Sequence, residues 1–197
     1  MDHHLLQRVV AHYAVDNDVS YSAEPQSFTP APSLPAGDWG ELGEYYRHIR
    51  QGKWFCRVGD PVFVTFHPVT DCEALADGWE QPECVPFATL VDDSTLFVHI
   101  PSGRVLCCRP GDGEEYWVAP SLSAFLGAVA DIVELESEPG DHPDIDEEGY
   151  PHSERFVSRV EAILARHMPD AGHRETFRGV LHLITAAEEA WGGVHGS

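Results

Sequence analysis

Apolar residues in the middle of the chain first follow a strand period and then a helix period. Residues 95–100 and 104–109 form two runs rich in β-branched and aromatic residues, separated by three residues that end in Gly103. This pattern predicts a β-hairpin, because glycine tolerates the left-handed backbone of a three-residue loop. Both faces of the two strands are largely apolar, which favours a central place in a sheet. Beyond a short third strand, apolar positions from Leu122 to Val133 follow i, i+3, i+4 spacing, and Ser121 is placed to cap this helix.

The same reasoning predicts the other elements. Further helices are expected at 4–14, 40–51, 156–167 and 177–187, and further strands at 54–57, 62–66 and 87–91. Residues 70–78 are ambiguous and can hold a helical turn, and residues 81–86 are expected to interrupt regular secondary structure. Residues 21–37 are too rich in proline for a regular element. The order of these elements predicts an α+β fold with a mainly antiparallel sheet of four to six strands, covered by helices and followed by a C-terminal helix pair.

Three segments of the chain differ in composition. We expect an N-terminal helix and proline-rich strap over 1–37 and an α+β core over 38–135. Residues 136–197 hold an acidic connector and the C-terminal helices, either in the same domain or as a small appendage.

Charge narrows the choice of partners. The chain has 33 Asp and Glu residues against 12 Lys and Arg residues, a formal net charge of −21. Nucleic acids and anionic membrane surfaces would be repelled by such a field. A protein with a basic surface is the partner that this charge favours, although solubility alone is an equally good explanation of it.

The cysteines and the N-terminal residues bear on the compartment. Five cysteines is an odd number, and Cys107 and Cys108 should point to opposite faces of a strand, so they should not bond to one another. Residues 1–8 lack the basic start and apolar stretch of a secretory signal, and no apolar run is long enough to span a membrane. These features predict a cytoplasmic protein whose cysteines are reduced thiols.

None of three familiar patterns of reactive or metal-binding residues is complete in the sequence. Asp144–Gly149 has the acidic spacing of a calcium loop, but Arg155 occupies the position of the bidentate glutamate, so an acidic connector is the better interpretation. No Cys-x2–4-Cys pair or His-Glu-x-x-His helix points to zinc. Cys72 lies near His67 and Asp71 in sequence, but catalytic triads are rarely built from such close neighbours. The sequence therefore predicts no metal, no cofactor and no catalytic residue.

Acidic and aromatic residues in the expected loops are the better candidates for function. Loops on a rigid scaffold concentrate binding residues, and aromatic side chains supply interface energy. The residues expected to contact a partner are Trp79, Glu80, Asp92, Asp93, Glu114, Glu115 and Tyr116. Each also has a simpler explanation, since Trp79 can cap the core and acidic turns are common in an acidic protein.

The central stretch resembles a known family. The Ser102–Val105 turn between two strands, the acidic glycine-rich turn, the next strand and the segment Ala119–Leu126 are similar to the C-terminal half of the SUKH superfamily. Upstream, Leu42–Gly52, Val58–Pro61 and Phe66 are similar in order to the opening helix and Gly-Pro turn of that family. The resemblance covers residues 34–135. The proline-rich lead-in, the acidic segment after Asp131 and the C-terminal helices depart from the family pattern.

The resemblance implies a bacterial immunity protein, since SUKH proteins largely bind and neutralise toxins of polymorphic toxin systems. It implies stoichiometric binding, no catalytic residues, and a monomer or weak dimer with a cognate toxin as partner. Two alternatives remain open from the residues: an intracellular regulatory or scaffold module of the same fold, and a small enzyme whose groups assemble only in three dimensions. A deep pocket of convergent titratable groups would favour the enzyme, whereas a shallow acidic surface would favour the binding protein.

Overall fold

A computed structural model describes residues 1–13, 18–51, 64–76, 82–90, 92–108, 115–136, 138 and 154–181. Its main feature is a five-stranded antiparallel sheet whose strands neighbour one another in chain order, β3-β4-β5-β6-β7. The strands are β3 (Val64–Phe66), β4 (Cys84–Leu90), β5 (Thr95–His99), β6 (Arg104–Cys108) and β7 (Glu115–Ala119). Helices pack against this sheet, so the fold is α+β, as the sequence predicted.

The central hairpin has the geometry that its residues predict. Strands β5 and β6 pair antiparallel, and Gly103 in their connection has φ +70°, a left-handed value that glycine adopts without strain. Leu96 and Val98 belong to the main core, whereas Phe97 and Leu106 form a smaller apolar cluster on the opposite face. Both faces of the hairpin are therefore buried, which explains why its strands are apolar throughout.

Helix α4 (Leu122–Glu136) lies at the centre of the helical layer. The Ser121 hydroxyl accepts a hydrogen bond from the Ala124 amide at 3.0 Å, so the predicted N-cap is confirmed. The Glu41 carboxylate of helix α2 (Gly40–His48) also accepts bonds from the Ser123 amide at 2.8 Å and the Ser123 hydroxyl at 2.6 Å. These contacts satisfy orphan donors of the first turn and join α4 to α2.

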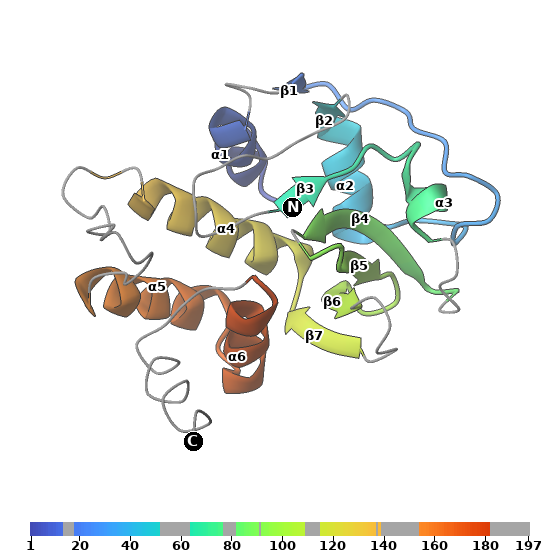
Figure 1. The fold of residues 1–197 in the computed structure, drawn as a ribbon. Helices are drawn as coiled ribbons and strands as arrows, with labels where there is room; N and C mark the ends of the chain where they lie inside the picture. The colour runs from blue at the N-terminus through green and yellow to red at the C-terminus, as the bar shows by residue number, and fades with distance from the viewer. Residues whose placement is uncertain are drawn as a thin grey trace.

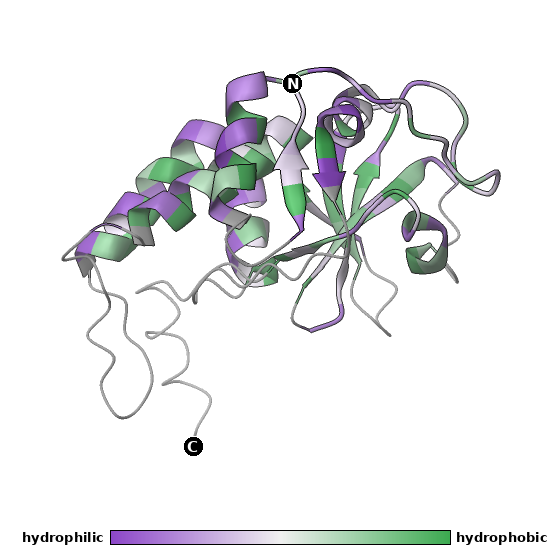
Figure 2. Cartoon of the chain, turned by 90° about the horizontal axis from the view of Figure 1, so that it is seen from above, coloured by the Kyte–Doolittle hydropathy of each residue, from purple (hydrophilic) through white to green (hydrophobic). Residues whose placement is uncertain are grey.

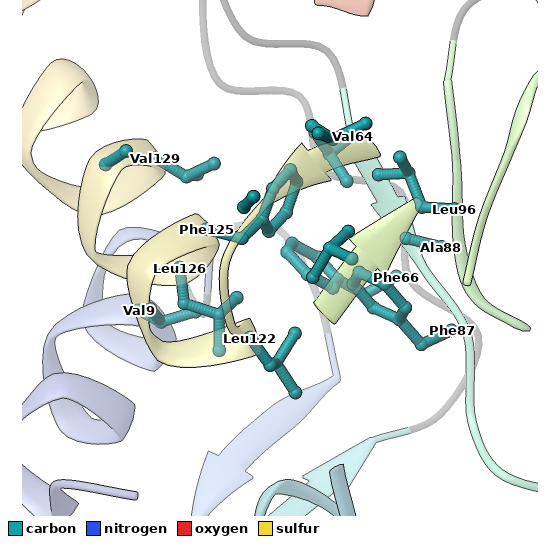
Figure 3. Packing of buried hydrophobic residues seen from close by; sticks show 14 of the residues in the cluster. Val9, Val64, Phe66, Phe87, Ala88, Leu96, Leu122, Phe125, Leu126 and Val129 are labelled. Atoms are coloured by element: carbon teal, nitrogen blue, oxygen red, sulfur yellow. The ribbon is translucent and has the colours of Figure 1, made fainter. Parts of the chain in front are cut away.

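The core between α4 and the sheet is continuous. Figure 3 shows Phe125 and Leu122 of α4 directed toward Phe66, Phe87 and neighbouring strand residues. The ring centroids of Phe87 and Phe125 are 5.8 Å apart in an edge-to-face arrangement, which aromatic pairs prefer. On its other sides α4 contacts α1 (His3–Tyr13) and α5 (Glu154–His167), so this helix is buried nearly all round (Figure 1).

The C-terminal helices α5 and α6 (Ala171–Val180) pack together, as predicted. Helix α5 lies along α4, and α6 lies beside β7 (Figure 1). Hydrophobic and hydrophilic residues are interspersed along these helices (Figure 2), and their buried apolar side chains include Phe156, Leu164 and Phe177. This is the arrangement expected of amphipathic helices that cover a core.

Two local predictions were wrong. The helix expected over residues 40–51 ends at His48, because Ile49–Gln51 forms strand β2, which pairs with β1 (Val19–Tyr21) in a separate two-stranded sheet. The breaker expected at 81–86 overlaps strand β4, which begins at Cys84. Pro86 is accommodated there because the pairing of β4 with β5 shifts register between Pro86 and Ala88, and such irregularities tolerate a residue without an amide hydrogen.

The remaining predictions concern shorter segments. The helical turn within 70–78 is confirmed as α3 (Cys72–Leu75). In the proline-rich segment 21–37, Tyr21 is the last residue of β1, which was not predicted, and residues 22–37 contain no helix or strand. The strand expected at 54–57 lies outside the described residues. Within the described ranges, no helix combines the length and the apolar character that crossing a bilayer requires.

Candidate functional site

One end of the sheet carries several of the residues expected to contact a partner. Thr95 at the start of β5 pairs with Cys108 at the end of β6, and Cys108 pairs with Glu115 at the start of β7. Neighbouring strands lie about 4.8 Å apart, so Thr95 and Glu115 are separated by roughly 10 Å. The turn that carries Asp92 and Asp93 leads directly into Thr95. We call Asp92, Asp93 and Glu115 the acidic sheet end.

Backbone and side-chain hydrogen bonds hold the turn of the acidic sheet end. The Asp92 carboxylate accepts from the Ser94 amide at 3.0 Å, and the Asp93 amide donates to the Leu90 carbonyl at 3.1 Å. Asp93 has φ +62°, a left-handed conformation in which aspartate and asparagine are among the few tolerated non-glycine residues. Asp92 and Asp93 are both exposed. The carboxylates of Asp92 and Asp93 therefore lie on a short turn whose backbone is fixed by hydrogen bonds.

The other predicted contact residues have different surroundings. Glu115 is exposed, whereas Tyr116 is half-buried and packs against the main core. Trp79, Glu80 and Glu114 lie outside the described residues, as do the acidic segment 144–149 and the glycine-rich turn 111–113. The predicted contact residues that the structure describes therefore all lie at one end of the sheet.

Sequence reasoning missed an ionic cluster that joins three helices. Asp131 of α4 accepts hydrogen bonds from Arg8 of α1 and from Arg166 and His167 of α5. Arg8 also binds both carboxylate oxygens of Glu134, with distances of 2.9 Å from Nε and 2.7 Å from Nη2. Bidentate pairs of this kind are the geometrically specific form of an arginine–carboxylate contact. We call Arg8, Asp131, Glu134, Arg166 and His167 the helix ionic cluster.

The cluster keeps its carboxylates ionised. Burial raises the pKa of Asp131, but hydrogen bonds from Arg8 and His167 and the charge of Arg166 outweigh that effect and lower it below its usual value. The hydrogen bond from Arg8 is the main cause that lowers the pKa of Glu134. The same contacts raise the pKa of Arg8 further above its usual value. The cluster is consequently a set of charged contacts between helices.

A hollow of about 360 Å³ lies beside the cluster, between α4 and α5. Its charged lining includes Asp131, Glu134 and Glu138 on one side and Arg159 and Arg166 on the other. Arg159 binds both oxygens of Glu138, with distances of 2.7 and 2.9 Å. Since these opposite charges already pair across the hollow, the arrangement is that of a helix interface rather than a site that selects a ligand of one charge.

Cys72 does not have the surroundings of a nucleophile. Its thiol lies 3.2 Å from the Tyr46 hydroxyl, and burial raises the pKa of Cys72 to about 11. His67 Nε2 lies 2.8 Å from the Thr89 hydroxyl. An activated cysteine needs a lowered pKa and a base within hydrogen-bond reach, whereas the pKa of Cys72 is raised. None of the four described cysteines forms a disulfide.

One group of described side chains has the composition of a metal site. His3 of α1 and Glu44 and His48 of α2 bring two imidazoles and one carboxylate together, with ligand atoms within 4.8 Å of one another. This group shares no residue with the acidic sheet end or the helix ionic cluster.

The chain was also compared with known proteins. No protein-family model matches it, and no curated protein is found to be similar to it.

Proposed function

We propose that this protein is a binding protein of the SUKH immunity kind. In this proposal it forms a stoichiometric complex with a cognate toxin and blocks a basic surface of that toxin. The sequence resemblance over residues 34–135 motivates the proposal. The α+β fold, with its antiparallel sheet and packed helices, is compatible with it.

The observation that carries the proposal is the acidic sheet end. Asp92, Asp93 and Glu115 are exposed and lie on a tight turn and a strand start of one sheet. Because the turn and the strand order the backbone of these residues beforehand, less conformational freedom is lost on binding than for residues of a long loop. A rigid acidic surface of this kind suits capture of a cationic partner.

The distribution of positive charge adds to this argument. Among the described residues, the arginines that form ion pairs with carboxylates on or beside the helices include Arg8, Arg47, Arg159, Arg166 and Arg178. The formal net charge of −21 already counts these cations, so the longer-range field of the chain is negative. A toxin with a cationic cleft would be drawn to such a field, and its association with this protein would be accelerated by electrostatic steering.

The first test is co-expression with the product of a neighbouring gene that encodes a large secreted protein with a variable C-terminal end. The proposal predicts rescue of growth and purification of a 1:1 complex. A sheet-end variant carrying Asp92→Asn, Asp93→Asn and Glu115→Gln should rescue growth less well at equal expression. Asparagine can keep both the amide contact at 92 and the left-handed backbone at 93, so the variant removes charge while preserving the turn.

A matched control separates local from overall charge. The control variant carries Asp18→Asn, Glu24→Gln and Glu175→Gln, three exposed carboxylates elsewhere on the chain. It removes the same number of charges, and it should rescue growth like the unmodified protein. Absence of any complex with the toxin would refute the proposed function, and equal loss of rescue in both variants would refute the role of the acidic sheet end.

A further inference from the structure

We propose that His3, Glu44 and His48 form a binding site for a divalent transition-metal ion, with Zn²⁺ as the ion that best suits the donor set. The three side chains come from the first turn of α1 and the last turns of α2. Their ligand atoms all lie within 4.8 Å of one another. This inference is independent of the toxin-binding proposal and involves other residues.

Glu44 and His48 are aligned by helix geometry. Residues four apart in a helix lie on the same face, and Nε2 of His48 is 3.7 Å from Oε2 of Glu44. His48 is buried, with only 3 % of its surface exposed. Its Nδ1 donates a hydrogen bond to the Ser22 carbonyl at 2.8 Å, which leaves the lone pair on Nε2 for an ion. A backbone carbonyl on the second ring nitrogen is the usual way in which proteins orient a metal-binding histidine.

The Glu44 carboxylate is also oriented by a neighbour. Arg47 Nη1 donates to Oε1 of Glu44 at 2.6 Å. The other oxygen, Oε2, is the one that lies near His48. Hydrogen bonding of one carboxylate oxygen while the other coordinates the ion is a common outer-shell arrangement in metal sites.

His3 completes the set from a different helix. Its ring centroid is 4.4 Å from that of His48, and its Nδ1 lies 2.8 Å from the Tyr21 hydroxyl. Tyr21 ends β1 and Ser22 follows it, so one short segment contacts the Nδ1 atoms of both histidines. His3 is exposed, which gives an ion a route into the site from solvent.

The donor set points to zinc rather than to calcium or magnesium. Two imidazole nitrogens and one carboxylate oxygen suit Zn²⁺, whereas Ca²⁺ and Mg²⁺ prefer oxygen ligands alone. With ligand bonds of about 2.0–2.1 Å, donors on one tetrahedral ion lie about 3.3 Å apart. The Glu44 and His48 donors, 3.7 Å apart, need to approach each other only slightly, and no pair of donors has to close by more than roughly 1.5 Å. The exposed His3 ring is the part that can move. Three protein ligands leave the fourth position to water.

Calorimetric titration of Zn²⁺ into the metal-free, full-length protein tests the proposal. We expect one Zn²⁺ per chain and a rise in the unfolding temperature with Zn²⁺ concentration, because the ion binds the folded chain. His3→Ala and Glu44→Gln should each weaken binding by about 100-fold or more, since changes to outer-shell partners alone cost about 10- to 100-fold. Tyr21→Phe, which alters only the contact to His3, should weaken binding by about tenfold.

His4→Ala is the matched control. His4 is the exposed neighbour of His3 on α1 and is not part of the cluster, so its removal should leave the affinity unchanged. Circular dichroism of each variant checks that the fold is retained. Equal weakening by His4→Ala and His3→Ala would mean that Zn²⁺ binds to exposed histidines without a built site. That result, or Zn²⁺ binding unaffected by Glu44→Gln, or no binding at all, would overturn the proposal.

Discussion

Among the described glycines, Gly127 of α4 leaves the least room for a Cβ atom, because the His167 ring of α5 lies against it. A Cβ atom at this position would lie 2.6 Å from Cε1 and 2.8 Å from Nδ1 of His167. Non-bonded carbon atoms prefer separations of about 3.5–4.0 Å, so the ring must move by roughly 1 Å to admit a methyl group. Nε2 of the same ring lies 2.5 Å from the Asp131 carboxylate, so Gly127→Ala should disturb the helix ionic cluster although no charged residue is replaced.

The magnitude follows from two opposing effects. Replacing glycine by alanine inside a helix stabilises it by about 1 kcal/mol. Overpacking a closed interface costs about 1–3 kcal/mol, and a weakened hydrogen bond to a charged group costs about 1.5–3 kcal/mol. We expect Gly127→Ala to lower the free energy of unfolding by about 2 kcal/mol in the unmodified protein. In a His167→Ala background the obstruction is gone, and the same substitution should raise that free energy by about 0.5–1 kcal/mol.

Urea unfolding of the four proteins, followed by tryptophan fluorescence, measures this reversal of sign. The double-mutant cycle should give a coupling of about 2–3 kcal/mol between positions 127 and 167. An equal effect of Gly127→Ala in both backgrounds would show that His167 does not occupy the space against Gly127. Stabilisation in the unmodified protein would refute the close packing of α4 on α5.

Three further predictions concern the helix ionic cluster, the buried thiol and the helix cap. Because the pKa values of Asp131 and Glu134 are lowered on folding, their contribution is complete above the unfolded values of about 4 and is lost as pH falls through the folded ones. Urea unfolding at a series of pH values should therefore show a shallower loss of stability below about pH 5 for Asp131→Asn than for the unmodified protein, and equal slopes would contradict this. Cys72 should be alkylated at pH 8 only as fast as the protein unfolds, while the half-buried Cys108 reacts sooner; peptide mapping by mass spectrometry distinguishes them, and early labelling of Cys72 would refute its burial. Ser121→Ala should lower the unfolding free energy by about 1 kcal/mol through loss of the cap on α4, and an unchanged denaturation midpoint would show that this cap contributes nothing.

The features that could be predicted from the sequence are those determined by neighbouring residues. A strand period alone places Leu96 and Val98 on one face and Phe97 on the other, as the structure has them, because successive side chains alternate in direction. The turn at Gly103 and the cap at Ser121 are equally local, since each depends on one side chain and the few residues after it.

Features that depend on pairing between distant segments were beyond that reasoning. Ile49–Gln51 continues the helical pattern of α2, yet it forms a strand because β1 lies beside it to accept its hydrogen bonds. The Asp131 contacts to Arg8 and Arg166 join residues from opposite ends of the chain. No periodicity in the sequence connects such positions.

The candidate sites show the same division. Asp92 and Glu115 could be identified as loop residues of an acidic chain, but their common location follows only from the register of β5, β6 and β7. His3 could not be connected with His48, because sequence motifs for zinc place paired ligands a few residues apart, whereas these two histidines come from different helices.

The rate of association with the cognate toxin, measured by stopped flow against sodium chloride concentration, tests the central claim most directly. The account predicts that the unmodified protein associates fastest at low salt and slows steeply as salt is added. The sheet-end variant should associate about 3- to 10-fold more slowly at low salt, with a shallower salt dependence, while the control variant should remain close to the unmodified protein. A rate independent of salt, or identical rates for the two variants, would contradict capture through the acidic sheet end.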